Sequence, residues 1–285
     1  MHEVKIGIIG GTGIYNLDNM KLIDEVSIDT PYGSPSDKYI IGELNGIKVA
    51  FLSRHGRGHR ISPSELNSRA NIYGFKELGV KYLIGVSAVG SLRDEIEPSH
   101  LVFPDQIIDR TKGRPSTFFG NGVVAHAAFA EPFCKKLTDK LVESSEALGI
   151  KYHKDKTYVC MEGPLFSTKA ESNFHRMIGG DVIGMTAIPE AKLAREAEIC
   201  YAMIVLSTDY DCWKEGEEAV TVDMVIQTMN KNIHTAKKLL SDLIPKIGND
   251  ECGCHTSMEY AIMTHKEHWP KDAKEKMGLI IERFL

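Results

Sequence analysis

The sequence lacks the features of a secreted, membrane-spanning or nucleic-acid-binding protein. Its six cysteines are scattered through 285 residues and do not form the dense framework of a disulfide-stabilised secreted domain. The first residues lack the basic and apolar regions of a signal peptide, and no apolar run approaches the about 20 residues that cross a membrane. The net charge is −5, and no stripe of lysine or arginine offers a surface for nucleic acid. We therefore expect a cytoplasmic protein that binds small molecules.

Linkers, internal repeats and low-complexity tracts are also missing, so no composition shift separates two domains. Apolar runs of strand length alternate with segments of helical spacing. This alternation predicts an α/β fold: a single domain with a central mixed, largely parallel sheet flanked by helices. We assign this domain to residues 1–250. Residues 251–285 are expected to form a C-terminal extension, with a helix from Lys271 to Phe284, packed on the same domain or on a neighbouring subunit.

The apolar run from Ile199 to Leu206 is the clearest buried strand, and two carboxylates follow it, Asp209 and Asp211. Parallel sheets bind ligands at the carboxyl ends of their strands. In extended chain the two side chains point the same way, and one buried carboxyl beside another has a raised pKa, so that it can hold a proton near pH 7. From these residues alone, a solvated loop with an Asx turn is an equal alternative.

Other strand ends carry groups that suit an anion. Gly10 to Gly13 includes Thr12 but matches neither the dinucleotide fingerprint nor the P-loop, and a tight structural turn is its commoner explanation. Ser53 to Arg60 is the densest cationic loop, with a solvated basic loop as the alternative. A small hydroxyl-bearing loop starts at Ser87. Because all three follow strands, we expect them to meet at one sheet edge and to hold phosphate there.

The cysteines raise a separate question. Cys134, Cys160 and Cys200 lie in apolar segments, where a cysteine is usually a small core residue. Cys252 and Cys254 flank one glycine and are compatible with a redox pair or with half a metal site. No second pair of ligands stands near them in the sequence. We therefore predict an inert or redox-labile tail segment and no metal.

A set of motifs, in a fixed order over residues 4 to 248, resembles the S-methyl-5′-thioadenosine phosphorylases, a family in the trimeric branch of the purine nucleoside phosphorylases. The motifs are Gly7-Ile8-Ile9-Gly10-Gly11-Thr12-Gly13, Arg54-His55-Gly56, Asn71-Ile72-Tyr73, Glu162-Gly163-Pro164, Phe166-Ser167, Met185-Thr186, Pro189-Glu190 and Thr208-Asp209-Tyr210-Asp211-Cys212-Trp213. The resemblance implies cleavage of 5′-methylthioadenosine by phosphate into adenine and 5-methylthioribose 1-phosphate, in purine and methionine salvage. It implies no metal or organic cofactor, because inorganic phosphate is a co-substrate.

The resemblance also implies roles for individual residues. Phosphate would be held by Thr12, Arg54, His55, Ser87, Ala88 and Thr186. The nucleoside would be held by Met185 at the ribose, by Phe166, Ser167, Asp209 and Asp211 at the adenine, and by Val220, Val222 and a neighbouring subunit's His126 at the methylthio group. Asp209 and Asp211 would be catalytic: one gives a proton to the leaving purine and the other accepts hydrogen bonds from its amino group. Which of the two carries the proton stays open.

Two positions bear on the substrate. Family members that act on inosine and guanosine carry Asn at the position of Asp209, and an apolar Val222 suits a thioether better than a hydroxyl, so adenine and a methylthio group are favoured.

Three positions depart from the family: Leu165 and Lys169 stand where Arg is common, and Ser87 stands where the animal enzymes carry Thr. Leu165 removes a charge near the purine loop, whereas Ser87 keeps its hydroxyl.

Three alternatives stay open at this point: a broader purine nucleoside phosphorylase acting on adenosine and inosine, a hydrolytic methylthioadenosine nucleosidase, and a non-catalytic nucleotide-binding module. The Arg54 loop argues against the hydrolase, which has no use for a dianion. The resemblance further implies a homotrimer or a dimer of trimers. We expect an exposed aromatic loop around Phe118 and Phe119 to contribute to that interface.

Overall fold

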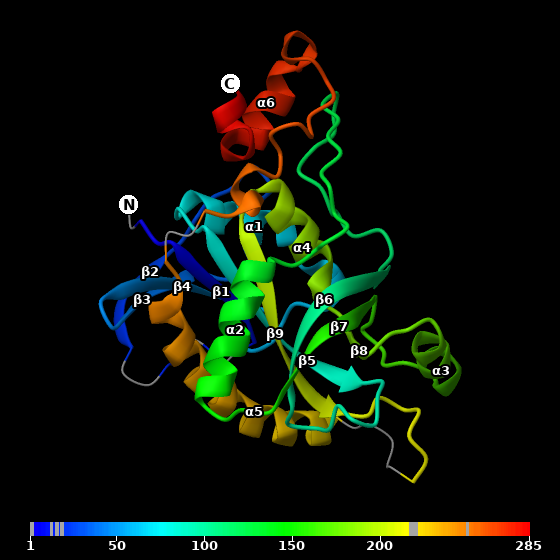
Figure 1. The fold of residues 1–285 in the computed structure, drawn as a ribbon. Helices are drawn as coiled ribbons and strands as arrows, with labels where there is room; N and C mark the ends of the chain where they lie inside the picture. The colour runs from blue at the N-terminus through cyan, green and yellow to red at the C-terminus, as the bar shows by residue number, and fades with distance from the viewer. Residues whose placement is uncertain (1–2, 12–13, 15–16, 18–19, 217–221, 249–250) are drawn as a thin grey trace.

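The structure is a computed structural model that describes residues 3–11, 14, 17, 20–216, 222–248 and 251–285 (Figure 1). Its sheet has nine strands: β1 Ile6–Gly10, β2 Lys21–Val26, β3 Tyr39–Leu44, β4 Ile47–Ser53, β5 Tyr82–Ser91, β6 Leu101–Arg110, β7 Tyr152–Met161, β8 Val182–Gly184 and β9 Cys200–Asp209. The α-helices are α1 Ser68–Glu77, α2 Lys135–Ala147, α3 Lys169–Met177, α4 Ala187–Glu196, α5 Val222–Leu243 and α6 Lys271–Met277. Short 3₁₀ turns include η1 Pro63–Glu65, η3 Gly253–Thr256, η5 Gly278–Ile280 and η6 Glu282–Phe284.

The sheet order is β2-β3-β4-β1-β5-β8-β7-β6-β9, and β5 also pairs with β9. Strand β5 therefore has three neighbours, and the strands β5, β8, β7, β6 and β9 close on themselves into a small barrel. The β1–β4, β1–β5, β5–β9, β6–β7 and β7–β8 pairs are parallel, and the remaining pairs are antiparallel. The predicted α/β class with a mixed, largely parallel sheet is confirmed.

Helices cover both faces of the sheet. One apolar cluster joins the sheet to α1 and α4 through residues such as Phe75 and Leu193. A second cluster joins the other face to α2 and α5 through Leu137 and Leu240. In Figure 1, α2 lies in front of the strands and α5 runs along the lower edge of the molecule. Two-sided burial explains why the central strands are continuous apolar runs rather than alternating ones.

Local sequence patterns predicted most of the helices and strands, and the differences between their predicted and observed bounds have physical causes. Strands β5 and β9 run on to Ser91 and Asp209, so polar residues expected in loops are paired in the sheet. The capping box at Ser62 is present but begins the 3₁₀ turn η1, and α1 starts only after Asn67, whose side chain accepts from Ala70 N at 3.3 Å. The long tail helix expected up to Phe284 ends at Met277, because Gly278 has φ +48° and only 3₁₀ turns follow. Strands β2 and β3 and helix α3 were not predicted.

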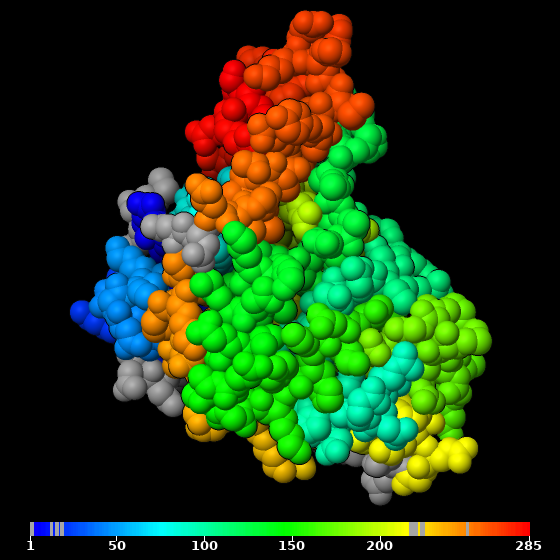
Figure 2. All heavy atoms as spheres, viewed as in Figure 1, coloured from blue at the N-terminus to red at the C-terminus, as the bar shows by residue number. Residues whose placement is uncertain are grey.

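Residues 251–285 pack against a segment that precedes α2. Ala125 and Ile262 form a β-bridge, and Met263 N donates to Val124 O at 2.8 Å. The two segments together form the lobe at the top of Figures 1 and 2, which projects from the rest of the molecule. Phe118 and Phe119 are 4% and 8% exposed and join the core, so the expectation of an exposed aromatic loop was wrong. The division at residue 250 stays a prediction.

No helix in the described ranges is both long and apolar enough to cross a membrane. The cytoplasmic location remains a prediction.

Candidate active site

A cavity of about 260 Å³ lies where the carboxyl ends of β1, β4, β5, β8 and β9 converge. It is lined by Gly11, Arg54, His55, His59, Pro63, Val86, Ser87, Ala88, Val89, Gly90, Met161, Phe166, Ile183, Gly184, Met185, Thr186, Thr208, Asp209, Asp211 and Met229. Nine residues predicted for the site are in this set. The structure thus brings the cationic loop and the paired carboxylates to one cavity.

The pairing of β5 explains this convergence. Its parallel pairing with β9 places Gly90 opposite Asp209. Strand β8 crosses the end of β5 in the antiparallel sense, with Gly90 opposite Ile183, so the chain after β8 runs back along β5. Thr186 consequently reaches Ser87, and its Oγ1 donates to Ser87 Oγ at 3.0 Å. The two hydroxyls lie together because β8 is antiparallel to β5, a pairing that the sequence analysis did not predict.

Arg54 is a buried guanidinium with a buried counterion. Its side chain donates through Nε and Nη2 to Glu190, with Nη2–Oε2 at 3.0 Å, and to the carbonyl oxygens of Val86 and Ile9. Burial would lower the pKa of Arg54, but the Glu190 carboxylate raises it above its ordinary value. These contacts use four of the five N–H donors. One Nη1 N–H has no partner among the described residues, so Arg54, which lines the cavity, retains one donor.

His55 is neutral at physiological pH. Burial, with help from the Arg54 charge, lowers the pKa of His55 to about 4. Its Nδ1 lies 2.8 Å from Ile61 O, and a carbonyl oxygen only accepts, so the ring proton is on Nδ1. The other ring nitrogen, Nε2, is therefore an acceptor. The ring stacks on His59, with ring centroids 4.3 Å apart.

The surroundings of Asp209, the last residue of β9, raise the affinity of its carboxyl group for a proton. Burial raises the pKa of Asp209 to about 6, and the nearby Asp211 charge adds to this rise. Thr208 Oγ1 lies 2.6 Å from Asp209 Oδ2 and 3.0 Å from Val89 O, but it has only one proton to give. Thr208 can therefore donate to Val89 O while a protonated Asp209 keeps its own proton for Thr208 or for a ligand.

Asp211 completes an Asx turn, because its backbone N–H donates to Asp209 Oδ1 at 2.8 Å. The alternative that the sequence left open is therefore partly right: the turn exists, but it lies in a cavity rather than in solvent. Burial raises the pKa of Asp211. Its buried Oδ2 has no hydrogen-bond partner within the described part of the chain, which leaves an acceptor for a ligand donor.

Met185 is positioned by two residues outside the cavity. Arg114, on the loop before α2, donates to the carbonyl oxygens of Met185, Ile188 and Glu162, at 2.6, 2.8 and 2.6 Å. Gly163 has φ +70°, and a Cβ there would lie 2.5 Å from Met185 Sδ, so a larger residue would displace that side chain. Phe166 follows on the same loop and is 49% exposed at the cavity.

The other predicted residues are not at the cavity. The Ser167 hydroxyl lies 3.8 Å from Met161 Sδ and also interacts with Asp211, where it offsets part of the rise in pKa that burial causes. Val222 is 63% exposed at the start of α5. His126 is exposed on the projecting lobe, where its N–H donates to Ala261 O. Leu165 is 81% exposed, so the departure from Arg leaves the cavity wall unchanged. Thr12 and Val220 lie outside the described residues.

Sequence reasoning missed the roles of Glu190, Arg114, His59 and Met229. Glu190 is 2% exposed and accepts from Arg54 and from Tyr201 Oη. The Pro189-Glu190 motif marked this position in the sequence but did not indicate its pairing with Arg54. Arg114 lies in a loop that we expected at the surface. Met229, on the cavity side of α5, had only the helical spacing of apolar residues as a signal.

Comparisons with known proteins agree with this geometry. Residues 5–245 match the family model of the phosphorylase superfamily. The S-methyl-5′-thioadenosine phosphorylase of Geobacter sulfurreducens is 50% identical, over 99% of this chain and 100% of its own length. The enzyme of that name from Chloroflexus aurantiacus is 52% identical, over 100% of this chain and 99% of its own.

Solved structures give the same result. A methylthioadenosine phosphorylase from an antarctic soil metagenomic library superposes with a TM-score of 0.92 at 46% identity, covering 98% of this chain and 99% of the other. Methylthioadenosine phosphorylase of Schistosoma mansoni in complex with adenine gives 0.83 at 33% identity, covering 98% of each chain. The chain therefore belongs to the phosphorylase superfamily and, within it, to the S-methyl-5′-thioadenosine phosphorylases.

Proposed function

We propose that this chain is a pentosyltransferase that cleaves 5′-methylthioadenosine with phosphate, giving adenine and 5-methylthioribose 1-phosphate. The observation that carries the proposal is a single cavity with anion donors at one end and a protonatable carboxyl pair at the other. Full-length relatives at about 50% identity carry the name of this activity. Their names and the cavity together favour methylthioadenosine over a broader nucleoside range.

At the phosphate end, the proposed ligands are the Arg54 Nη1 donor and the hydroxyls of Ser87 and Thr186. Because Glu190 already balances the Arg54 charge, hydroxyl and backbone donors at Ser87, Ala88 and Thr186 would supply much of the binding. The unprotonated Nε2 of His55 can accept from the remaining P–OH of a hydrogenphosphate dianion. That contact would orient the anion with one unprotonated oxygen toward C1′.

At the purine end, bond cleavage builds positive charge on the sugar and negative charge on adenine. A phosphate oxygen forms the new bond to C1′ as the C1′–N9 bond breaks and its electron pair passes to the purine. Neutral Asp209 gives its proton to N7, and the unpaired Oδ2 of Asp211 accepts from the 6-amino group. Phe166 would pack on the base, and Met185 would contact the ribose. Met229 offers an apolar wall for the methylthio group. Contacts of that group with Val220, Val222 and a neighbouring subunit's His126 stay part of the proposal.

Phosphate dependence tests the reaction type. Without phosphate, we expect adenine release from methylthioadenosine to fall to about 1% or less of the rate with phosphate, because no nucleophile then occupies the anion end of the cavity. Adenine is measured by liquid chromatography and the sugar phosphate by phosphorus NMR. Equal rates with and without phosphate would identify a hydrolase, and no turnover under either condition would leave only a binding module.

Asp209→Asn tests the proton donor. We expect kcat/KM for methylthioadenosine to fall about 100- to 1000-fold, because the leaving purine loses its acid. The wild-type kcat/KM should fall as the pH rises through about 6, since the acid of the free enzyme is then ionised. In Asp209→Asn, the plot of kcat/KM against pH should not show this fall. The relative rate on inosine should rise, because an amide can donate to a 6-oxo group.

Asp211→Asn serves as the matched control for that experiment. It removes the neighbouring carboxylate but leaves Asp209 in place, so the fall of kcat/KM at rising pH should persist. Wild-type turnover and an unchanged pH profile in Asp209→Asn would remove Asp209 from the catalytic set.

Thr186→Val tests the anion end. The substitution removes the hydroxyl that contacts Ser87, and we expect the phosphate KM to rise about 10-fold or more with little change in the methylthioadenosine KM. Thr138→Val, on α2 and away from the cavity, is the control and should leave both constants unchanged. Initial rates over a matrix of both substrates give the two constants. A rise confined to the nucleoside KM would contradict the assignment.

We also propose that the chain forms a homotrimer or a dimer of such trimers. The projecting lobe exposes Val124, Tyr260 and Met263 by 49%, 90% and 62%, an apolar surface next to His126 that suits a second copy of this chain. Tyr260→Glu should lower the solution mass measured by light scattering and raise the methylthioadenosine KM. Leu22→Glu, 58% exposed on β2, should leave the mass unchanged. A wild-type mass of one chain would refute the trimer.

A further inference from the structure

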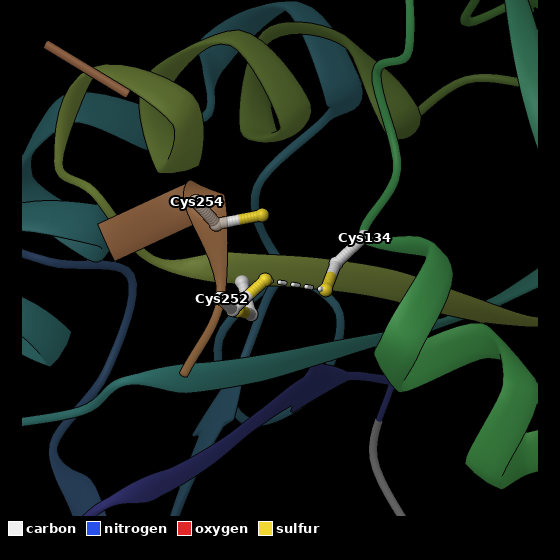
Figure 3. A group of neighbouring side chains, drawn as sticks. Cys134, Cys252 and Cys254 are labelled. Atoms are coloured by element: carbon white, nitrogen blue, oxygen red, sulfur yellow. Dashed lines mark hydrogen bonds between the residues drawn. The ribbon is translucent and has the colours of Figure 1, made fainter. Parts of the chain in front are cut away.

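Four cysteines from three separate parts of the chain meet beneath the C-terminal segment. Cys134 is the N-cap of α2, Cys200 begins β9, and Cys252 and Cys254 flank the start of η3. Their four Sγ atoms all lie within 4.8 Å of one another. Figure 3 shows Cys134, Cys252 and Cys254 directed toward one another. We predicted no metal because the tail pair had no second pair of ligands beside it, and the structure supplies that second pair.

We propose that Cys134, Cys200, Cys252 and Cys254 bind one Zn²⁺ as a structural tetrathiolate site. A zinc–sulfur bond of about 2.3 Å in tetrahedral geometry places neighbouring sulfur atoms about 3.8 Å apart. Cys134 Sγ and Cys252 Sγ are 3.6 Å apart, close to that edge and well beyond the about 2.05 Å of a disulfide. The remaining sulfur–sulfur distances need to shorten by about 1 Å at most to reach that edge length, and Cys252 and Cys254 lie on a partly exposed turn.

Zinc binds the thiolate form of cysteine. Cys134 caps the N-terminus of a 13-residue helix, where the helix dipole stabilises negative charge. Binding of zinc displaces the thiol protons into solvent, and the resulting complex carries two net negative charges.

Groups around the four sulfur atoms can offset that charge. His255 Nε2 lies 3.8 Å from Cys200 Sγ and His255 Nδ1 lies 3.3 Å from Glu198 O. A neutral ring donates to only one of these two acceptors, and a ring that donates from Nε2 would give an N–H···S hydrogen bond to the site. Lys136 Nζ donates to Glu251 O at 2.5 Å, next to Cys252 in sequence. A lysine ammonium group and an imidazole ring thus border the cluster.

The site is structural rather than catalytic. All four positions of a tetrahedral metal would be filled by protein, with none left for water or substrate. Cys200 and Asp209 stand at opposite ends of β9, about 30 Å apart along an extended strand. The metal would instead fasten the tail to α2 and β9. The ion pair of Glu198 with Arg283 and the hydrogen bond from Met258 N to Glu198 hold later parts of the same tail.

Cobalt binding tests the site directly. The full-length chain, reduced under anaerobic conditions, is titrated with Co²⁺ and then with Zn²⁺ while the absorption spectrum is recorded. We expect one equivalent of Co²⁺ to give the sulfur-to-metal charge-transfer bands of a tetrahedral tetrathiolate, and one equivalent of Zn²⁺ to abolish them. Zinc content measured by mass spectrometry should be about one per chain.

Matched variants assign the ligands. Cys254→Ser, on the partly exposed turn, and Cys134→Ser should lose the charge-transfer bands, whereas Cys160→Ala, a buried cysteine outside the cluster, should keep them. Removal of zinc by a chelator should lower the melting temperature of the wild type but not that of Cys254→Ser, and turnover at low temperature should persist. No tetrathiolate spectrum in the reduced wild type would overturn the proposal. Disulfides in the cluster of the freshly isolated chain, seen as an intact mass lower by the lost hydrogens, would do so as well.

Discussion

The hydrogen bonding of β5 to three strands is the constraint on which the rest of this structure depends. Pairing with β1 continues the open part of the sheet, and pairing with both β8 and β9 closes the barrel. The parallel β9 brings Asp209 to Gly90, and the antiparallel β8 returns Thr186 to Ser87. With any one of these pairings missing, the anion end and the purine end of the cavity would not face each other.

Burial then sets the charge on each group in that cavity. The Arg54 guanidinium is tolerated in the core because Glu190 pairs with it, and this pairing limits how much positive charge it offers to a ligand. His55 loses its proton and Asp209 gains affinity for one, both because burial penalises the charged form. The cavity therefore combines the Arg54 cation, balanced by Glu190, with the neutral imidazole of His55 and with Asp209, an acid that can be neutral. These groups suit charge that develops during the reaction better than a fixed charge in the substrate.

Strand β9 links the two chemically distinct regions of the molecule. Its first residue, Cys200, belongs to the thiol cluster and its last, Asp209, to the cavity. The strand is buried along almost its whole length, so it is a rigid connection between the tail attachment and the acid. The projecting lobe that carries the apolar surface is built from that tail, which places the proposed subunit contact and the proposed zinc site in one structural unit.

The sequence by itself determined the α/β class, most of the strands, the pairing of Asp209 with Asp211 and the family, because apolar runs, turn residues and short motifs are local properties of the chain. Only the tertiary structure decided that Arg54 is paired with Glu190, 136 positions away, and that Cys134 meets Cys252, 118 positions away. It also placed Phe118 and Phe119 in the core and moved Ser167 and Val222 away from the cavity wall. Such contacts depend on how strands pair and on how much surface each segment finally covers, and no window of a single sequence contains that information.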